Sequence, residues 1–371
     1  MKDRLVSLDA FRGLTVALMI LVNNPGSWAH IHPPLRHAAW HGLTPTDLVF
    51  PFFLFIVGTA MSLSFARRIE AGAGRGDLVR KIVVRALIIF ACGLFLNGFP
   101  FFGQDFGTLR IMGVLQRIAL SYLGAGLVVV FLGRTVTRAA AFLFFVALYE
   151  LAMRLPLVAG WGGFALETNL VRWVDLGVLT EPHMYRTAGV AFDPEGLLST
   201  LTATATTLLG FFTGEMLRRE GSLPAKLRAM AIAGTGLVVA GLGLALLEPV
   251  NKQLWTTSYV VITAGLALLT LAACSWMVDL RGWKAGVRPA VVYGSNPLVV
   301  FLGSGLLVRI LLLVKVPADE GIRSLGRALY LGLFEPAAGP VWGSFFNAVV
   351  HVVLWLGVSW WLWRRRIFVK I

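Results

Sequence analysis

About ten long apolar runs recur along the 371-residue sequence, and they constrain the fold more than any other feature. A helix needs roughly 20 mostly apolar residues to cross a bilayer. Such runs lie near residues 10–24, 45–66, 81–98, 109–132, 137–157, 195–217, 227–247, 256–278, 289–314 and 340–363. We therefore predict about ten transmembrane helices in a single domain over residues 1–371.

The composition supports lipid as the solvent of this chain. Hydrophobic residues make up 57% of the sequence and charged residues 14%, with a mean hydropathy of +0.77, which is more apolar than a soluble core can bury. Unpaired backbone groups are not tolerated in hydrocarbon, and a β-barrel would alternate polar and apolar residues instead of forming long apolar runs. The predicted fold class is all-α.

Basic residues alternate between the two sides of these predicted helices, as the positive-inside rule requires. The richer side receives Lys2, Arg4, Arg67, Arg68, Arg75, Arg80, Lys81, Arg134, Arg138, Arg218, Arg219, Lys226, Arg228, Arg281, Lys284, Arg288, Arg364, Arg365, Arg366 and Lys370. We expect this side and both termini to be cytoplasmic. The net charge of +14 then reflects topology, and no nucleic-acid partner is predicted.

Several smaller features refine this prediction. The first apolar run lacks a small-residue cleavage site after it, so we expect a retained span and not a signal peptide. Cys92 and Cys274 lie inside apolar runs and give no sign of a disulfide. Two outer loops, residues 155–194 and 315–339, are long enough to cover a site.

Four of the six histidines, His30, His32, His37 and His41, fall in the loop of residues 24–44. A neutral imidazole can accept a proton or attack an acyl carbon near neutral pH. Asp47 can orient such a ring, and Asn23 can donate a hydrogen bond to a developing oxyanion. We therefore expect the chemistry to centre on this loop, chiefly on His37.

Two other readings of these histidines stay open at this point. A loop histidine often caps a helix or bonds to the backbone. His37 and His41 are spaced i, i+4, which on a helix would suit a metal ion, but no second pair of ligands is evident, so no metal is expected.

Eight sequence segments, taken together, resemble one family. They are SLDAFRG at 7–13, MILVNNPG at 19–26, HAAWHG at 37–42, DLVFP at 47–51, LRIMGVLQRI at 109–118, FDPEG at 192–196, NKQLWTTS at 251–258 and GSNP at 294–297. The family is that of the heparan-alpha-glucosaminide N-acetyltransferases and their bacterial relatives, and the resemblance runs through almost the whole chain.

This resemblance implies a transmembrane acyltransferase that moves acetyl from cytoplasmic acetyl-CoA to an amino sugar, such as a glucosamine-type glycan, across the membrane. The family's catalytic histidine falls on His37, its nearby asparagine on Asn23 and its aspartate on Asp47. The lysosomal member has an extra N-terminal luminal segment, so we expect the shorter form, a multi-pass protein of the bacterial inner membrane. The resemblance also suggests a homodimer.

Acetyl-CoA carries phosphates, and basic or amide side chains would hold it. Cytoplasmic candidates are Arg12, Arg80, Lys81, Arg85 and Arg134. Gln116 and Arg117 lie about eight residues into the fourth predicted span, and Asn296 follows Gly294 at a possible break in the ninth. These three would line a cavity for the cofactor.

The acceptor site is expected on the outer face. Candidates for substrate binding are Trp40, His41, Asp193, Glu195, Lys252, Trp255 and Ser258. His37 would either carry the acetyl group as acetyl-imidazole or act as general base during direct transfer. The alternative function is a secondary transporter of a small anionic or sugar substrate, because Arg117, Asn296 and a broken helix also suit a midplane site.

Overall fold

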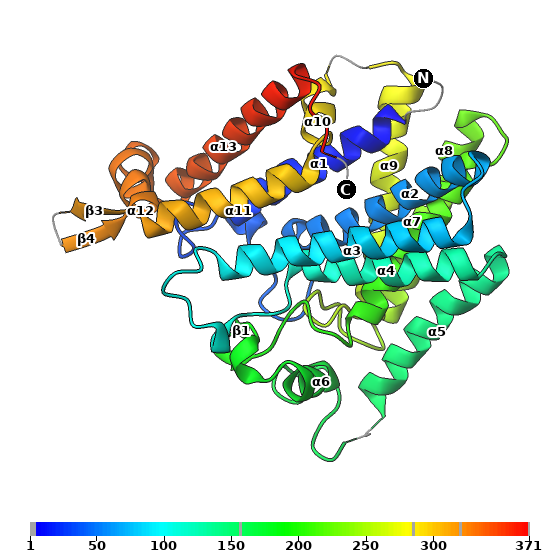
Figure 1. The fold of residues 1–371 in the computed structure, drawn as a ribbon, viewed down its shortest axis with the longest axis horizontal. Helices are drawn as coiled ribbons and strands as arrows, with labels where there is room; N and C mark the ends of the chain where they lie inside the picture. Colours follow the sequence, from blue (N-terminus) through cyan, green and yellow to red (C-terminus); the bar gives the residue numbers. More distant parts are fainter. Residues whose placement is uncertain (1–4, 156–157, 284–285, 319–320, 370–371) are drawn as a thin grey trace. The chain divides into compact units, whose positions relative to one another are not determined.

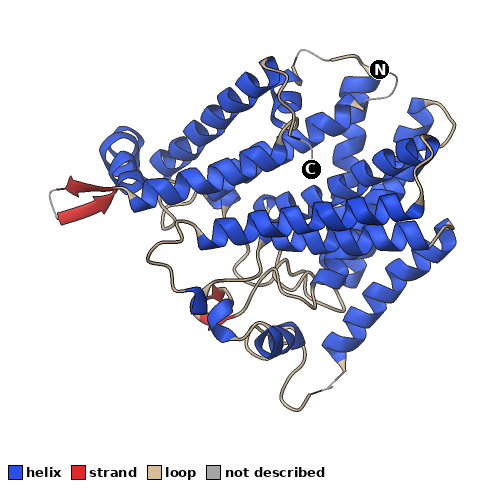
Figure 2. Cartoon of the chain, in the orientation of Figure 1, coloured by secondary structure: helices blue, strands red, loops and turns tan. Residues whose placement is uncertain are grey.

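The structure, a computed structural model, describes residues 5–155, 158–283, 286–318 and 321–369. Helices dominate this part of the chain, and the strands form two short hairpins (Figures 1 and 2). The α-helices are α1 (Val6–Asn23), α2 (Val49–Glu70), α3 (Arg75–Gly98), α4 (Val114–Phe131), α5 (Thr135–Arg154), α6 (Leu170–Val178), α7 (Thr200–Arg218), α8 (Leu223–Leu244), α9 (Thr257–Ser275), α10 (Arg288–Tyr293), α11 (Pro297–Leu313), α12 (Leu325–Leu329) and α13 (Glu335–Arg364). The predicted helical class is confirmed, apart from the hairpins.

The two hairpins are antiparallel. Strand β1 (Arg186–Thr187) pairs with β2 (Val190–Ala191), and β3 (Lys315–Ala318) pairs with β4 (Gly321–Ser324) in the register Lys315 to Ser324. They occupy the two segments predicted as long outer loops, together with α6 in the first and α12 in the second. Four residues used in the topology prediction, Lys2, Arg4, Lys284 and Lys370, lie outside the described residues.

Each of the ten predicted runs coincides with a helix: α1, α2, α3, α4, α5, α7, α8, α9, α11 or α13. Within the described ranges, seven helical stretches are long and apolar enough to cross a membrane. The other three helices are α3, which begins with a charged segment, α7, which is rich in threonine, and α11, which has only 17 residues. The multi-pass membrane class is thus supported, and the count of ten stays a prediction.

The apolar helices differ in which faces they expose. The most apolar windows of α5, α8 and α13 are only 17%, 22% and 22% buried within the protein, whereas that of α9 is 67% buried. Large side chains such as Ile232, at 74% exposed, and Phe144, at 61%, lie on these outer helices. Such surfaces would be unfavourable in water and are expected where lipid is the solvent.

The chain folds into two compact units that are described separately. Unit 1 comprises Met1–Ala38, Thr44–Phe50 and Thr270–Lys370, and unit 2 comprises Ala39–Leu43 and Pro51–Leu269, with Ile371. The segment between α1 and α2 is therefore shared, because residues 39–43 belong to unit 2. The single-domain prediction is not tested by this division.

In unit 1, α1 packs against α10 through a close backbone crossing. A Cβ on Gly13 would lie 1.7 Å from the carbonyl oxygen of Ala290, and one on Gly294 would lie 2.2 Å from that of Asp9. Only glycine permits this approach. The predicted break near Gly294 is present, since α10 ends at Tyr293 and α11 begins at Pro297.

Helix α13 in unit 1 contains a second interruption. Gly339 has φ of 74° and ψ of 173°, which separates a short first turn from the long apolar helix that follows it. The predicted start of the last span, residue 340, coincides with this point. A φ in the left-handed region favours glycine at this position.

In unit 2, α2, α3, α4, α5 and α7 pack around a buried interior, and α8 packs on α9. A Cβ on Gly210 of α7 would lie 2.0 Å from the carbonyl oxygen of Phe55, so α2 and α7 touch backbone to backbone. On α8, Gly234 and Gly241 contact α9, whereas a Cβ on Gly236 or Gly243 would meet nothing within 4 Å. Close packing thus explains only half of the glycines on α8.

Two predicted helix starts are wrong by about five residues. The fourth predicted span begins at 109 and the sixth at 195, but α4 starts at Val114 and α7 at Thr200. The side-chain amide of Asn97 donates to the carbonyls of Arg110 and Met112, at 2.9 and 3.1 Å, and holds that segment extended. Such contacts to side chains far away in the sequence compete with helix formation and leave no local signal.

Candidate active site

The segment between α1 and α2 is mostly irregular. It contains two single-turn 3-10 helices, η1 (Pro33–Leu35) and η2 (Pro45–Leu48), and residues 36–44 form no helix. The prolines that open both turns limit helix propagation from the preceding residues. His37 and His41 therefore do not share a helix face, so their i, i+4 spacing does not support a metal-binding pair.

Within unit 1, His37 is held by Asp47. The Nδ1 atom of His37 lies 2.6 Å from Oδ1 of Asp47, and the carboxylate is 1% exposed whereas the imidazole is 42% exposed. The other carboxylate oxygen accepts the backbone N–H groups of Ala38 and Thr44, both at 3.1 Å, and the hydroxyl of Thr44 at 2.8 Å. Asp47 is thus fixed from two sides and presents one oxygen to the ring.

The position of Asp47 follows from local sequence. Thr44 and Asp47 form a capping box at η2, in which each side chain bonds to the other's backbone. The sequence Thr-Pro-Thr-Asp carries this signature, with proline at the first helical position. The same carboxylate that caps the turn therefore orients the histidine.

This arrangement fixes the tautomer of His37. An ionised carboxylate only accepts hydrogen bonds, so Nδ1 of His37 carries the proton that it donates to Asp47. The lone pair then lies on Nε2. A carboxylate behind the ring also stabilises the imidazolium or acyl-imidazolium that forms when Nε2 reacts. The pair has the chemistry of a nucleophile or a general base.

The two asparagines that end α1 differ. Asn23 is the last helical residue and is exposed, as an oxyanion donor would need to be. Asn24 is 6% exposed, its amide donates to the carbonyl of Ile20 at 2.6 Å, and its Oδ1 atom is buried without a hydrogen-bond partner in the described chain. Sequence reasoning did not single out Asn24.

In unit 2, His41 and Trp40 anchor residues 39–43 to other loops. Nδ1 of His41 lies 3.2 Å from Nδ2 of Asn251, so the amide donates and the ring nitrogen accepts. Burial lowers the pKa of His41, which favours the neutral ring. The indole N–H of Trp40 donates to the carbonyl of Phe164 at 2.8 Å.

Arg117 forms a buried cationic centre in unit 2. It is the fourth residue of α4 and not eight residues into a span, and it is fully buried as expected for an interior arginine. Its Nη2 atom donates to the carbonyl of Gly196 at 3.0 Å and to the hydroxyl of Ser199, and its guanidinium lies 5.1 Å from the ring centre of Trp255. Nε and Nη1 have no hydrogen-bond partner in the described residues.

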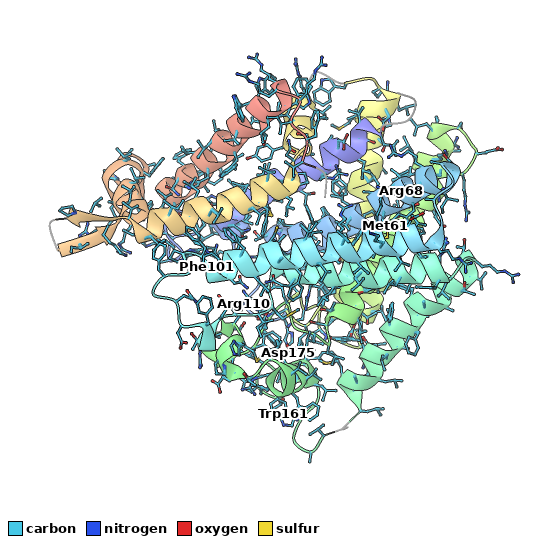
Figure 3. All side chains as sticks on the ribbon, in the orientation of Figure 1. Met61, Arg68, Phe101, Arg110, Trp161 and Asp175 are labelled. Atoms are coloured by element: carbon cyan, nitrogen blue, oxygen red, sulfur yellow. The ribbon has the colours of Figure 1, made fainter. Side chains whose placement is uncertain are left out.

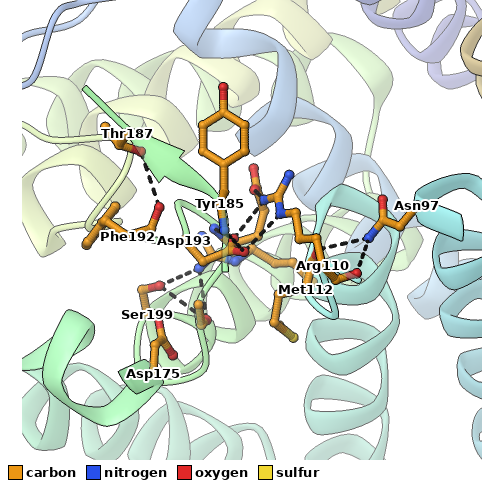
Figure 4. Close-up of polar contacts among 12 residues, drawn as sticks. Asn97, Arg110, Met112, Asp175, Tyr185, Thr187, Phe192, Asp193 and Ser199 are labelled. Atoms are coloured by element: carbon orange, nitrogen blue, oxygen red, sulfur yellow. Dashed lines mark hydrogen bonds and ion pairs between the residues drawn. The ribbon is translucent and has the colours of Figure 1, made fainter. Parts of the chain in front are cut away.

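A second arginine of unit 2 binds the two predicted substrate carboxylates (Figure 4). Arg110 contacts Asp193 in a bidentate manner, at 2.9 and 2.7 Å, and Glu195 at 2.5 Å. Burial disfavours the charge on Arg110, but these two carboxylates more than offset it and raise its pKa. Asp193 and Glu195 are 0% and 9% exposed, so this ion-pair cluster already accounts for both.

Comparison with known proteins finds one matching family model and two similar curated proteins. A family model described as "Heparan-alpha-glucosaminide N-acetyltransferase, catalytic" matches residues 4–183. The human protein of that name is 27% identical over 356 residues, which are 81% of this chain and 52% of the human chain. The chain is thus similar to the heparan-alpha-glucosaminide N-acetyltransferases. The mouse protein of that name is 25% identical over 422 aligned positions, covering all of this chain and 61% of its own length.

The predicted resemblance to this acetyltransferase family is therefore confirmed, and the chain spans only about half to three fifths of the length of these relatives. The family model covers residues 4–183, which include His37, Asp47, Arg110 and Arg117. It ends before Asp193 and Glu195. The pairwise matches extend the similarity across the rest of the chain.

The predicted cofactor residues of unit 2 lie at two opposite ends of the α3–α4 pair. Helices α3 and α4 are antiparallel neighbours, because Gly126 approaches Ile82 and Gly93 approaches Gln116. Arg80, Lys81 and Arg85 lie in the first half of α3, and Arg134 precedes α5. Gln116 and Arg117 lie at the other end, at the start of α4. One phosphate site cannot use both sets.

The set at the start of α3 and before α5 is more exposed to solvent than the set at the start of α4. Arg80, Lys81 and Arg134 are exposed, and Arg85 is half-buried over the ring of Tyr122, at 4.9 Å. Exposed basic residues are free to meet phosphates, whereas Gln116 is 1% exposed.

The two predicted cofactor residues of unit 1 are engaged with protein groups. Arg12 pairs with Asp9 at 3.0 Å and contacts the carbonyl of Gly294. The amide of Asn296 donates to the carbonyl of Ile367 at 2.9 Å and accepts the N–H of Val369 at 2.8 Å. Asn296 thus lies near the end of α13 and not at mid-depth, and it holds the C-terminal segment.

The loop before α9 buries most of the remaining predicted substrate residues. Trp255 is 1% exposed with φ of 56°, and its indole N–H donates to the hydroxyl of Thr206 at 3.0 Å. Ser258 is fully buried, and its backbone N–H donates to Glu248. Lys252 is half-buried. An indole enclosed in this way cannot stack on a sugar, contrary to the role expected at the outer surface.

Asp175 on α6, labelled in Figure 3, has no role predicted from the sequence, and its carboxylate interacts electrostatically with Asp193 and Arg117. Its Oδ1 atom accepts the N–H of Leu197 at 2.8 Å, and its Oδ2 atom is buried without a partner in the described part of the chain. Burial raises the pKa of Asp175 to about 7. A single aspartate in a short helix gives no signal of this environment in the sequence.

Proposed function

We propose that this protein transfers the acetyl group of acetyl-CoA, taken from the cytoplasmic side, to an amino sugar or related glycan on the opposite side of the membrane. The observation that carries the proposal is the contact between the exposed imidazole of His37 and the buried carboxylate of Asp47. The relation to the acetyltransferases and the seven apolar helices support it.

Two routes use the same dyad. In the first, Nε2 of His37 attacks the thioester carbonyl, the C–S bond breaks, and CoA leaves as a thiolate that is then protonated. The neutral amine of the sugar next attacks the acetyl-imidazole, releases the imidazole and loses a proton. In the second, Nε2 takes the proton of the amine while that amine attacks the thioester directly. Asp47 stabilises the positive ring in both, and the exposed amide of Asn23 donates to the oxyanion.

Acetyl-CoA needs a phosphate site and a passage for its acyl arm. The exposed side chains of Arg80, Lys81 and Arg134 suit the phosphates of the nucleotide, with Arg85 beside them. Arg117 and Gln116 have buried nitrogen atoms without partners in the described residues, so they have hydrogen bonds to offer to an uncharged, amide-containing or carbonyl group. No metal ion is required by either route.

The topology of the proposal follows from the alternating basic residues. Ten spans with cytoplasmic termini, in a bacterial inner membrane, place the residue 24–44 loop outside and the start of α3 inside. Reporter fusions after residues 70, 133 and 219 should report the cytoplasm, and a fusion after residue 105 the opposite side. We also propose that the protein is a homodimer. The molar mass of the detergent-solubilised protein, measured by light scattering, tests this.

The function is tested by reconstituting the protein in proteoliposomes with labelled acetyl-CoA on one side and glucosamine on the other. Acetylation of the enclosed sugar supports transfer across the bilayer. Rapid quenching without acceptor separates the routes, because label retained on His37 indicates an acetyl-imidazole, whereas an active protein that never retains label transfers directly. No acetylation from either side contradicts the proposal.

The break between α10 and α11 is the one observation that suits a transporter, whose binding sites often use discontinuous helices. In this chain the side chain at that break, Asn296, is occupied by the backbone of Ile367 and Val369. Uptake of an intact glycan without acetyl transfer in the same proteoliposomes would favour transport.

A further inference from the structure

One face of α13 carries polar side chains along most of its length, which we call the polar face of α13. Its members are Ser344, Asn347, His351, Trp355 and Ser359. Their spacings of three and four residues place them on one side of a helix. From Ser344 to Ser359 the rise is about 22 Å, which is most of a hydrocarbon core of about 30 Å.

This face points into unit 1 and not toward lipid. Ser344, Trp355 and Ser359 are 1%, 9% and 0% exposed. By contrast, Val350 and Val353, on the opposite side of the helix, are 50% and 61% exposed. Polar groups in a span are costly and mark functional pathways, so a continuous polar face toward the interior requires a reason.

The polar face begins beside the loop that bears His37. The hydroxyl of Ser344 accepts the N–H of Ser27 and donates to its carbonyl, both at 3.1 Å. The amide of Asn347 donates to the carbonyl of Asn24 at 3.2 Å. The start of the residue 24–44 loop is therefore bonded to the first polar residues of α13.

Hydrogen-bonding groups along this face are left for a ligand. The indole N–H of Trp355, the hydroxyl of Ser359 and the Oδ1 atom of Asn24 are buried and have no partner among the described residues. His351 donates from Nδ1 to the carbonyl of Asn347 at 2.9 Å, which leaves Nε2 as an acceptor. The face thus offers two donors and two acceptors, and unpartnered buried groups destabilise a protein unless something binds them.

The other end of the polar face is basic. The guanidinium of Arg288 lies 4.9 Å from the ring centre of Trp360 and 5.3 Å from that of Trp363, and Arg364 lies 5.7 Å from Trp360. Arg365 and Arg366 follow directly. A ligand that follows this face would therefore place an anionic group at this end and uncharged polar groups along the helix.

We propose that the polar face of α13 binds the pantetheine arm of acetyl-CoA, with the nucleotide at the Arg288 end and the thioester at the Asn24 end. The arm is long, thin and uncharged, and its two amides and hydroxyl can pair with the acceptors of Asn24 and His351 at one end of the face and with the donors of Trp355 and Ser359 at the other. This inference rests on the proposed function, because it assumes that acetyl-CoA is the donor. It places both the arm and the nucleotide in unit 1, so it replaces the assignment of these groups to Arg80, Lys81, Arg85, Arg134, Gln116 and Arg117 of unit 2, and it gives α13 a role in binding.

Binding of two ligands tests the assignment. CoA and its nucleotide half alone, 3′-phospho-ADP, are titrated against the full-length protein in nanodiscs. Trp355→Phe and Ser359→Ala each remove one donor without adding volume and should each weaken CoA binding about 3- to 10-fold. Neither should change the affinity for 3′-phospho-ADP. Trp361→Phe, at a side chain that is 55% exposed, is the matched control and should bind both ligands as wild type does.

A cysteine scan gives a second readout that does not depend on these variants. In a Cys92→Ala, Cys274→Ala background, single cysteines at 347, 351, 355 and 359 should be protected from alkylation by CoA, and those at 346, 350 and 353 should not. The inference is overturned if CoA protects the cysteines at 346, 350 and 353 as well as those at 347, 351, 355 and 359. It is also overturned if Trp355→Phe and Ser359→Ala both bind CoA with unchanged affinity. If wild type binds no CoA, the proposed function itself fails; if wild type binds CoA and transfers acetyl while the variants bind normally, only this inference fails.

Discussion

Replacing Asp47 with asparagine tests the role of the dyad most sharply. The carboxylate lies 2.6 Å from Nδ1 of His37 and is almost fully buried. An asparagine of the same shape can turn its amide N–H toward the ring, in which case Nδ1 must accept and the proton moves to Nε2. The atom that should attack the acetyl group then has no lone pair to offer.

The magnitude follows from two contributions. Loss of a hydrogen bond to a charged group costs about 1.5–3 kcal/mol, which is about 10- to 150-fold in rate at 1.36 kcal/mol per factor of ten. The wrong tautomer adds to this, since the same substitution in Ser-His-Asp triads costs about 10⁴ in kcat. We expect kcat of Asp47→Asn to fall between about 10- and 10⁴-fold with little change in CoA affinity.

The substitution also weakens the cap at η2, so folding must be measured beside activity. Loss of a capping interaction costs about 1 kcal/mol, which leaves the protein folded. Asp77→Asn is the matched control, because Asp77 caps α3 by accepting the N–H of Gly74 at 3.3 Å and is exposed. Initial rates of acetyl transfer to glucosamine should separate the two variants. Equal kcat in folded Asp47→Asn and Asp77→Asn would refute the reasoning.

Three further predictions concern stability, measured as thermal unfolding in detergent. The pKa of Asp175 is raised from 3.8 to about 7, so between these values the folded protein holds a proton that the unfolded chain releases, and the free energy of unfolding falls as pH rises from about 4 to 7. Asp175→Asn should therefore stabilise the protein at pH 8, by up to about 4 kcal/mol, and should not do so at pH 4. Arg110→Met leaves two buried carboxylates without a counter-charge and should cost about 3–5 kcal/mol, whereas Arg186→Met, in an exposed pair with Glu181, should cost less than about 1 kcal/mol; similar losses would contradict this. Gly13→Ala should destabilise unit 1, because its Cβ would lie 1.7 Å from a carbonyl oxygen, and Gly236→Ala should be neutral or stabilising by about 1 kcal/mol.

The positions of the long helices could be predicted from the sequence because their apolar runs report local burial in lipid. The start of the last span at residue 340 and the break near Gly294 were also visible, since proline and glycine mark them. The start of α4 is not predictable in this way, because the side chain of Asn97 binds the backbone of Arg110 and Met112 from another helix. Before α7, the side chain of Asp175 accepts the N–H of Leu197 in the same manner. Such contacts depend on the fold and have no local pattern.

In the candidate site, too, features set by a local pattern could be predicted and features set by distant contacts could not. His37 and Asp47 are ten residues apart, and a capping box brings the aspartate to the loop, so a local pattern was sufficient. Trp255 was expected at the outer surface, but a backbone with positive φ turns its side chain into the interior beside Arg117. The polar face of α13 was missed because its serines and one histidine are scattered among apolar residues and only their burial distinguishes them.

The most direct measurement of the central claim is acetyl transfer by His37→Ala, compared with His32→Ala from the same loop. The ring centre of His32 lies 4.9 Å from that of Trp342, and among the described residues no carboxylate forms an ion pair with His32. Wild type and His32→Ala should acetylate glucosamine from acetyl-CoA, and His37→Ala should bind CoA but lose at least about 100-fold in kcat, the lower end of what a positioned acid or base contributes. A folded His37→Ala protein that binds CoA and keeps full transferase activity would contradict the account.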